Sequence, residues 1–130
     1  MESPEGLMYT KTDEWVKLDG DLAIVGITDY AQEQLSDIVY VEFIAEEDDS
    51  VTKGDAAATV ESVKAAADVQ FPVSGTITAL NEDLADSPET LNTDPFDSGW
   101  LLKLKLNDPA ELDNLLDANA YDAYNKEREG

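Results

Sequence analysis

The chain has 130 residues, 42% of them hydrophobic, which is enough for one domain with a packed core. Its 30 Asp and Glu residues against 8 Lys and Arg residues give a formal charge of −22, a field that repels nucleic acids and anionic membrane surfaces. It contains no Cys and no His, which excludes disulfides, zinc clusters built on those ligands, and Ser/His or Cys/His catalysis.

Most of the chain has the pattern of short strands separated by turns. Strands are predicted over residues 15–18, 22–27, 38–44, 56–62, 68–73, 76–80 and 100–106. Asp19-Gly20-Asp21 predicts a hairpin between the first two, because Asp-Gly readily adopts the positive φ of a tight turn. Many short strands with turn signals at near-regular spacing are typical of a small sandwich or barrel, so we expect a mainly β fold over residues 1–130.

Capping signals predict short helices between and after the strands. Residues 28–35 indicate one helix with Asp29 as its N-cap. Ser87-Pro88-Glu89 predicts one helical turn, because proline is well suited to the first helical position. Asp108-Pro109 begins another helix, and a last one is expected from Asn119. We expect these terminal helices to cover a face of the sheet.

The last predicted strand has a clear alternating pattern. Its apolar and basic residues alternate, which puts them on opposite faces of a half-buried strand. The apolar face is expected to hold Trp100, Leu102, Leu104 and Leu106, and the other face Lys103 and Lys105. Trp15, Trp100 and Phe71 are expected to pack in the core or in a cleft rather than to contact partners.

The negative charge also indicates the environment of the protein. A net charge of −22 destabilises a compact fold by self-repulsion, unless molar salt shortens the Debye length to a few Å. Our hypothesis is a halophilic protein in a salt-rich cytoplasm, whose acidic runs such as Glu46-Glu47-Asp48-Asp49 are solvated surface and not metal sites. Neither a signal-like apolar core near the N-terminus nor a membrane-spanning stretch is present, which favours a cytoplasmic location.

Lys64 is the residue that most directly suggests a function. It is one of seven lysines, and a tight hairpin between the strands on either side should leave it at the tip. The short side chains of Ser62 and of residues 65–67 leave room for an enzyme to approach the amine. These features fit a covalent attachment site, although geometry alone favours an ordinary exposed turn lysine. The surrounding sequence decides between the two.

The residues around Lys64 form a recognisable motif. They are Val60-Glu61-Ser62-Val63-Lys64-Ala65, followed by Asp68 and Pro72-Val73-Ser74-Gly75, and they resemble the lipoylation region of the glycine cleavage system H proteins. Other segments resemble family segments in the family order: residues 9–15, residues 25–32, Asp94-Pro95-Phe96, Gly99-Trp100-Leu101 and the helix that begins at Asp108-Pro109. The likeness covers nearly the whole chain, and several independent matches make it specific.

Two related families fit the motif less well. Biotin carriers usually place Met on both sides of the modified lysine, whereas Val63 and Ala65 flank Lys64 here. Lipoyl domains of 2-oxoacid dehydrogenase acyltransferases usually have Asp before the lysine, and they lack the strand that carries Glu14 and Trp15 and the C-terminal helices. The resemblance therefore implies an H protein, with the flattened β-barrel or sandwich of the lipoyl/biotinyl type and short peripheral helices.

Two positions depart from the family pattern. Asp13 and Tyr30 stand where the family usually carries histidine, which accounts for a chain without any histidine. The neighbouring Glu14, Trp15 and Gln32 match the family. The departures put in question any proton-transfer role at these two positions.

The resemblance implies a non-catalytic carrier with lipoate bound covalently to Lys64. The lipoyl-lysine arm spans about ten bonds of ~1.5 Å, so with staggered geometry it reaches on the order of 14 Å. It would accept the aminomethyl group of glycine from the pyridoxal-phosphate glycine decarboxylase and present it to the tetrahydrofolate-dependent aminomethyltransferase. A flavin-containing dihydrolipoyl dehydrogenase would then reoxidise the arm. The partners are these three enzymes and the enzyme that attaches lipoate, and we expect a monomer.

The family resemblance also implies a cleft for the loaded arm. The cargo carries an ammonium, which is favoured beside carboxylates and hydroxyls that are screened from water. Thr12, Glu14 and Asp68 are placed to line such a cleft. The simpler alternative for each is a polar residue of a turn or surface.

Two other functions stay open at this point. The lipoyl group could be relayed from Lys64 to 2-oxoacid dehydrogenases instead of serving glycine cleavage. Alternatively, the chain could be an unmodified acidic interaction module that retains only the fold.

Overall fold

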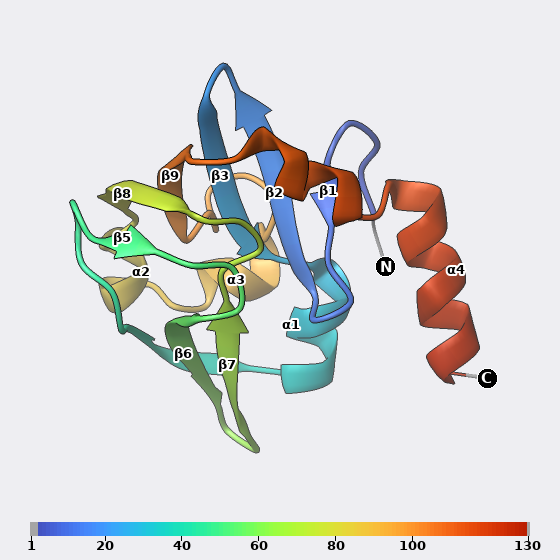
Figure 1. The fold of residues 1–130 in the computed structure, drawn as a ribbon. Helices are drawn as coiled ribbons and strands as arrows, with labels where there is room; N and C mark the ends of the chain where they lie inside the picture. The colour runs from blue at the N-terminus through green and yellow to red at the C-terminus, as the bar shows by residue number, and fades with distance from the viewer. Residues whose placement is uncertain (1–2, 130) are drawn as a thin grey trace.

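The computed structural model describes residues 3–129 and contains two antiparallel sheets with short helices around them (Figure 1). The larger sheet has the order β1 (Met8–Tyr9), β2 (Glu14–Asp19), β3 (Leu22–Ile27), β9 (Leu102–Leu106), β8 (Gly75–Leu80) and β5 (Ser50–Val51). The smaller sheet has the order β4 (Ile38–Phe43), β6 (Ala56–Ser62) and β7 (Ala66–Gln70). The predicted mainly β class is confirmed, and the strands over residues 3–129 form two sheets rather than one closed barrel.

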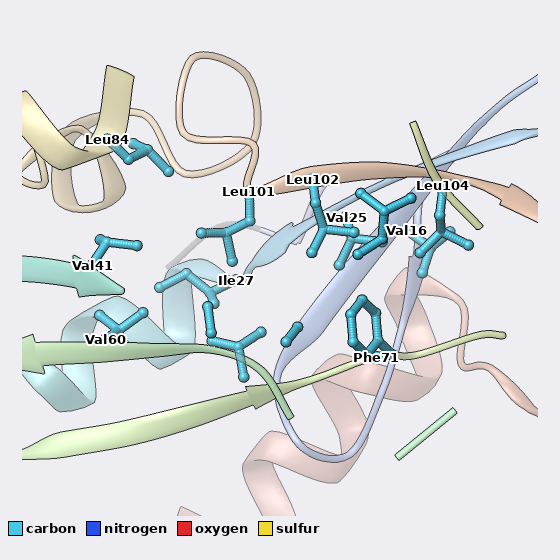
Figure 2. Packing of buried hydrophobic residues seen from close by; sticks show 14 of the residues in the cluster. Val16, Val25, Ile27, Val41, Val60, Phe71, Leu84, Leu101, Leu102 and Leu104 are labelled. Carbon is cyan, nitrogen blue, oxygen red and sulfur yellow. The ribbon is translucent and has the colours of Figure 1, made fainter. Parts of the chain in front are cut away.

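The core lies between the two sheets (Figure 2). Val16, Val25 and Leu104 of the larger sheet pack in one cluster with Val41 and Val60 of the smaller sheet. Each of these side chains is nearly or fully buried, and burying one Val or Leu stabilises a fold by roughly 1.5–3 kcal/mol. These apolar residues lie on the inner faces of the strands, since alternate side chains of a strand point to opposite faces of its sheet.

The first hairpin forms as predicted. β2 and β3 pair in register from Glu14 with Ile27 to Asp19 with Leu22, which leaves a two-residue turn. Gly20 occupies that turn with φ of 64°, a conformation that glycine adopts without steric cost. The Asp-Gly signal thus defines both the position of the turn and the face on which each side chain lies.

Helix α1 spans Asp29–Leu35, but its N-cap is Thr28 and not Asp29 as predicted. The Thr28 hydroxyl accepts a hydrogen bond from the Ala31 amide at 3.2 Å. Asp29 instead accepts a bond from the Gln32 side chain at 2.6 Å. Thr28 is fully buried and also bonds the Tyr121 hydroxyl, so a contact with a distant helix holds its side chain in the capping position.

The later helices differ from the prediction at their ends. The sequence did not predict α2 (Asp83–Asp86), and α3 spans Thr90–Thr93, just after the expected Ser87-Pro88-Glu89 signal. Asp108 caps a 3₁₀ helix, η1 (Pro109–Asn114), where a helix was expected. Helix α4 spans Ala118–Glu129 and begins one residue before the predicted start. No helix within residues 3–129 is long and apolar enough to cross a membrane.

Helix α4 packs at the edge of the larger sheet. Its Tyr121 stacks on Tyr9 of β1, with ring centroids 4.7 Å apart and an interplanar angle of 8°. Both rings belong to a second cluster with Trp15 and Tyr30. Trp15 and Val16 are adjacent on β2, so their side chains point to opposite faces of the sheet. Val16 belongs to the main core and Trp15 to the second cluster, so the second cluster lies on the face opposite the main core.

Trp100 does not lie on the face that was predicted for it. β9 begins at Leu102, and Leu101 and Leu102 are both fully buried, so the alternation does not extend to Trp100. The Lys103 ammonium lies 4.8 Å from the centre of the Trp100 ring, and both residues are partly exposed. The prediction of packing in the core or in a cleft is confirmed, because Trp15 and Phe71 are 1% and 2% exposed and the partly buried Trp100 packs against the second cluster.

Candidate functional site

Lys64 lies at the tip of the β6–β7 hairpin, which projects from the rest of the molecule (Figure 1). The two strands pair up to Glu61 and Ala66, so the tip consists of Ser62–Ala65. The Ser62 amide donates to the Ala65 carbonyl at 2.7 Å, and the Ser62 hydroxyl accepts from the Ala65 amide at 3.1 Å. These bonds close the turn from within and hold Lys64 on an ordered support.

The surroundings of Lys64 leave its amine open to solvent. Val63, Lys64 and Ala65 are all exposed, and Val63 has 70% of its surface accessible. The Val63 amide donates to the Asp37 carbonyl at 3.1 Å, which ties the tip to the chain just before β4. The predicted position of Lys64, an accessible amine at a tight turn, agrees with this geometry.

A cleft of about 180 Å³ lies beside the same hairpin, where its lining includes Val60 and Ala67, the second strand pair from the tip. Three segments enclose it: the turn that precedes β2, helix α1, and strands β6 and β7. Its lining residues are Thr12, Asp13, Glu14, Ile27, Ala31, Gln34, Leu35, Val60, Ala67, Asp68 and Val69. The structure therefore brings together Thr12, Glu14 and Asp68, the three residues that the family resemblance proposed for a common cleft.

Glu14 forms the buried polar end of the cleft. Only 2% of its surface is exposed. Its Oε1 atom accepts hydrogen bonds from the hydroxyls of Thr12 at 2.5 Å and Thr10 at 2.7 Å, and its Oε2 atom accepts one from the Gln70 amide at 3.3 Å. None of these three donors carries a positive charge, so the carboxylate is hydrogen-bonded but not neutralised by them.

Burial raises the pKa of Glu14 above its ordinary value. The bonds from Thr12, Thr10 and the Gln70 amide act in the opposite direction, and the nearby charge of Asp13 adds to the rise. A buried carboxylate in this state gains from any cation that enters the cleft, because the cation offsets the cost of desolvation. The site is thus suited to a small group with a positive charge.

Thr12 and Asp68 lie at the rim of the cleft. Both are exposed, and Thr12 donates to the carboxylate of Glu14. Asp68 accepts a hydrogen bond from the Thr59 hydroxyl at 3.0 Å, across a residue pair of β6 and β7. The rim is therefore polar and negative, and the interior carries one buried carboxylate.

The sequence did not predict several residues that shape the cleft. Gln34 lines it from α1, and Ile27, Leu35, Val60 and Val69 supply apolar walls. A helix with apolar spacing predicts that some face is buried, but not which distant segment it faces. In the sequence, Gln34 is a polar residue one turn after Tyr30 on that helix. Polar residues at such positions are too common for this one to indicate a role in a cleft.

Comparisons with known proteins agree with one another. Residues 7–128 match the family described as "Glycine cleavage H-protein". The chain is 49% identical over 129 residues to the glycine cleavage system H protein of Halothermothrix orenii, covering 99% of this chain and 100% of that protein. It is 49% identical over 130 residues to the H protein of Acidobacterium capsulatum, covering 100% and 99%.

A solved structure shows the same fold. The crystal structure of a glycine cleavage system H protein from Mycobacterium marinum matches with a TM-score of 0.86 and 34% identity. The match covers 95% of this chain and 98% of that one. Sequence and structure comparisons thus indicate the same group of proteins.

Proposed function

This chain belongs to the glycine cleavage H-protein family, a family of non-catalytic lipoyl carriers, and from that premise we propose that Lys64 carries the lipoyl group. The observation that supports this most strongly is the exposed position of Lys64 at the closed tip of the β6–β7 hairpin. Short side chains on either side leave the amine accessible to an attaching enzyme.

The length of the hairpin fits an arm rooted at Lys64. Asp68 is the third residue of β7, which begins at Ala66 next to the tip, so at about 3.3 Å per residue it lies roughly 7 Å along the strand from the tip. A lipoyl-lysine arm reaches on the order of 14 Å. The walls that β6 and β7 give to the cleft are therefore within the reach of an arm attached at Lys64.

Bound lipoate would supply a disulfide that accepts an aminomethyl group and is later reoxidised, and the residues of the chain supply the surroundings. Glu14 offers a buried negative charge to the cargo's ammonium, and the Thr10 and Thr12 hydroxyls hold that carboxylate in place. Ile27, Leu35 and Val60 exclude water from one side of the cleft. We propose that Glu14, Thr12 and Asp68 together retain the cargo between partners.

The proposed partners are glycine decarboxylase, aminomethyltransferase, dihydrolipoyl dehydrogenase and a lipoate-attaching enzyme, and the proposed state is a monomer. A relay of lipoyl from Lys64 to 2-oxoacid dehydrogenases would use the same lysine. An unmodified acidic module would use the fold without it.

The intact mass of the protein, purified from its native cells, tests these possibilities. We expect one lipoyl amide on the peptide that contains Lys64. A biotinyl amide on that peptide, or consistent absence of any modification, would contradict the carrier proposal.

We also propose that the protein works in a salt-rich cytoplasm. With 30 acidic and 8 basic residues, at least 22 acids have no basic residue of their own to pair with. The surface pair of Lys105 with Asp21 is 3.9 Å long, and both side chains are more than half exposed, so such contacts stabilise little. Repulsion among the remaining acids is then relieved mainly by ions in solution.

We expect a higher thermal unfolding midpoint in 2 M KCl than in 0.1 M KCl, by about 4 °C or more, which corresponds to roughly 1 kcal/mol for a domain of this size. The reason is that molar salt shortens the Debye length from about 10 Å to about 3 Å. The salt effect should shrink near pH 4, where carboxylates begin to take up protons. Equal midpoints at neutral pH would argue against a requirement for salt.

A further inference from the structure

Arg128 of helix α4 reaches across to the turn that immediately precedes Glu14. Its guanidinium donates to both carboxylate oxygens of Asp13, with Nη1 at 3.3 Å from Oδ2 and Nη2 in contact with Oδ1. The two residues are 115 positions apart in the chain. The exposed fraction of the side chain is 23% for Arg128 and 19% for Asp13. Such a two-pronged pair fixes orientation as well as distance.

The same guanidinium also rests on helix α1. Its central carbon lies 3.8 Å from the centre of the Tyr30 ring and 4.6 Å from that of Tyr124. Arg128 is thus placed between two aromatic rings, an arrangement that favours a cation. Because Tyr30 belongs to α1 and Asp13 to the turn before β2, one side chain connects two walls of the cleft.

A second contact from α4 reinforces this connection. The Tyr121 hydroxyl donates to Asp13 Oδ1 at 2.8 Å and lies 2.6 Å from the hydroxyl of Thr28, the N-cap of α1. Asp13 therefore receives bonds from two residues of one helix. Asp13 and Tyr30, the two positions that depart from the family pattern, contact the same arginine.

Asp13 needs such support because of its backbone. Its φ is 74°, in the left-handed region that is unfavourable for residues other than glycine. The Asp13 amide donates to the Thr10 carbonyl at 3.2 Å, and the Asp13 carbonyl accepts from the Thr28 amide at 3.0 Å. The adjacent residue is Glu14, so any movement of Asp13 moves the buried carboxylate.

We propose that Arg128 is a positioning residue that, by joining Asp13 to Tyr30, holds the turn before Glu14 against α1 and keeps the cleft closed around the cargo. This inference rests on the proposed carrier function. It assigns to the C-terminal helix a role in retaining the aminomethyl group, through a residue that does not itself line the cleft.

The test measures how fast lipoylated, loaded protein loses its cargo to water, as free formaldehyde, with no partner enzyme present. Arg128→Gln should speed this loss about threefold or more. This rate change corresponds to less free energy than a charge-assisted hydrogen bond contributes, because Arg128 acts on the cargo only indirectly. Arg128→Lys keeps the charge but loses the fork and the ring stacking, so its rate should lie nearer to Arg128→Gln than to the unchanged protein. Lys126→Gln removes a cation from the same helix without touching Asp13, and should leave the rate unchanged.

A double-variant cycle tests whether Arg128 acts through Asp13. Asp13→Asn is suited to this cycle, because asparagine tolerates the left-handed backbone while losing the charge. The variant with both changes should release cargo no faster than the faster single variant. Additive rates would overturn the proposed route through Asp13.

A readout that needs no lipoate separates this inference from the proposed function. The Glu14 carboxyl of the unmodified protein can be titrated by carbon NMR, well below the unfolding midpoint. In Arg128→Lys, which keeps a positive charge at this position, the pKa of Glu14 should fall toward its ordinary value, since a looser turn admits water. An unchanged titration with an unchanged release rate would overturn the role of Arg128.

Failure of the carrier proposal would appear differently. If the unchanged protein accepts no lipoate or no cargo, the proposed function is wrong, and the Glu14 titration alone decides whether Arg128 positions the turn. Should Arg128→Gln fail to fold, Arg128→Lys and Asp13→Asn carry the same comparison.

Discussion

Replacing Lys64 with arginine is expected to abolish attachment of lipoate and, with it, glycine–bicarbonate exchange in a system reconstituted with the partner enzymes. Arginine keeps the positive charge and a long side chain, but its guanidinium stays protonated and does not form the amide. The bonds that close the hairpin tip come from Ser62 and the backbone, so the substitution should leave the turn intact. Exchange should fall to the rate measured without this protein.

Lys53→Arg provides a matched control, because Lys53 is also an exposed lysine in a turn. That variant should be lipoylated normally and should support full exchange. Circular dichroism and the unfolding midpoint of Lys64→Arg should match those of the unchanged protein. Exchange that survives in Lys64→Arg would refute the proposed mechanism, and loss of exchange in both variants would point to a general effect of arginine.

The longer strands were predictable because they depend on local pattern, although β7 ends at Gln70 rather than at residue 73, and the two-residue strands β1 and β5 were not predicted. The alternation of apolar residues and the Asp-Gly turn specify β2 and β3 without reference to the rest of the chain. One error arose where a distant contact decides. Thr28 and not Asp29 caps α1 while bonded to the distant Tyr121. The error at Trp100 has a local cause, because the alternation of β9 begins only at Leu102.

The site was predictable to different degrees for the same reason. Lys64 follows from a turn within one short segment, so its exposure could be anticipated. Thr12, Glu14 and Asp68 came from family resemblance, since no local pattern shows that residues 54 or more positions apart share a cleft. The pairing of Arg128 with Asp13 spans nearly the whole chain and carries no local signal in a sequence with 30 acids.

Glu14→Gln should shorten the lifetime of the bound aminomethyl group by about tenfold or more, because truncating a buried charge pair typically costs 2–5 kcal/mol. Glutamine has the same shape and can keep accepting the Thr10 and Thr12 hydroxyls through its carbonyl oxygen. What it loses is the negative charge that faces the cargo's ammonium, together with the weak bond from the Gln70 amide, which an amide nitrogen in place of Oε2 cannot accept. The rate of formaldehyde release from loaded protein measures the effect, and Glu42→Gln, an exposed glutamate on β4 that does not line the cleft, controls for net charge.

The raised pKa of Glu14 adds a dependence on pH to this comparison. In the unchanged protein, burial makes Glu14 take up a proton at a higher pH than an exposed glutamate would. As the pH falls through that range, the carboxylate loses its charge and its hold on the ammonium weakens, whereas glutamine has no charge to lose. The ratio of release rates between Glu14→Gln and the unchanged protein should therefore be largest at neutral pH and shrink toward one as the pH falls. A ratio near one at neutral pH would show that Glu14 does not retain the cargo, and a constant large ratio at all pH values would show that its effect does not depend on charge.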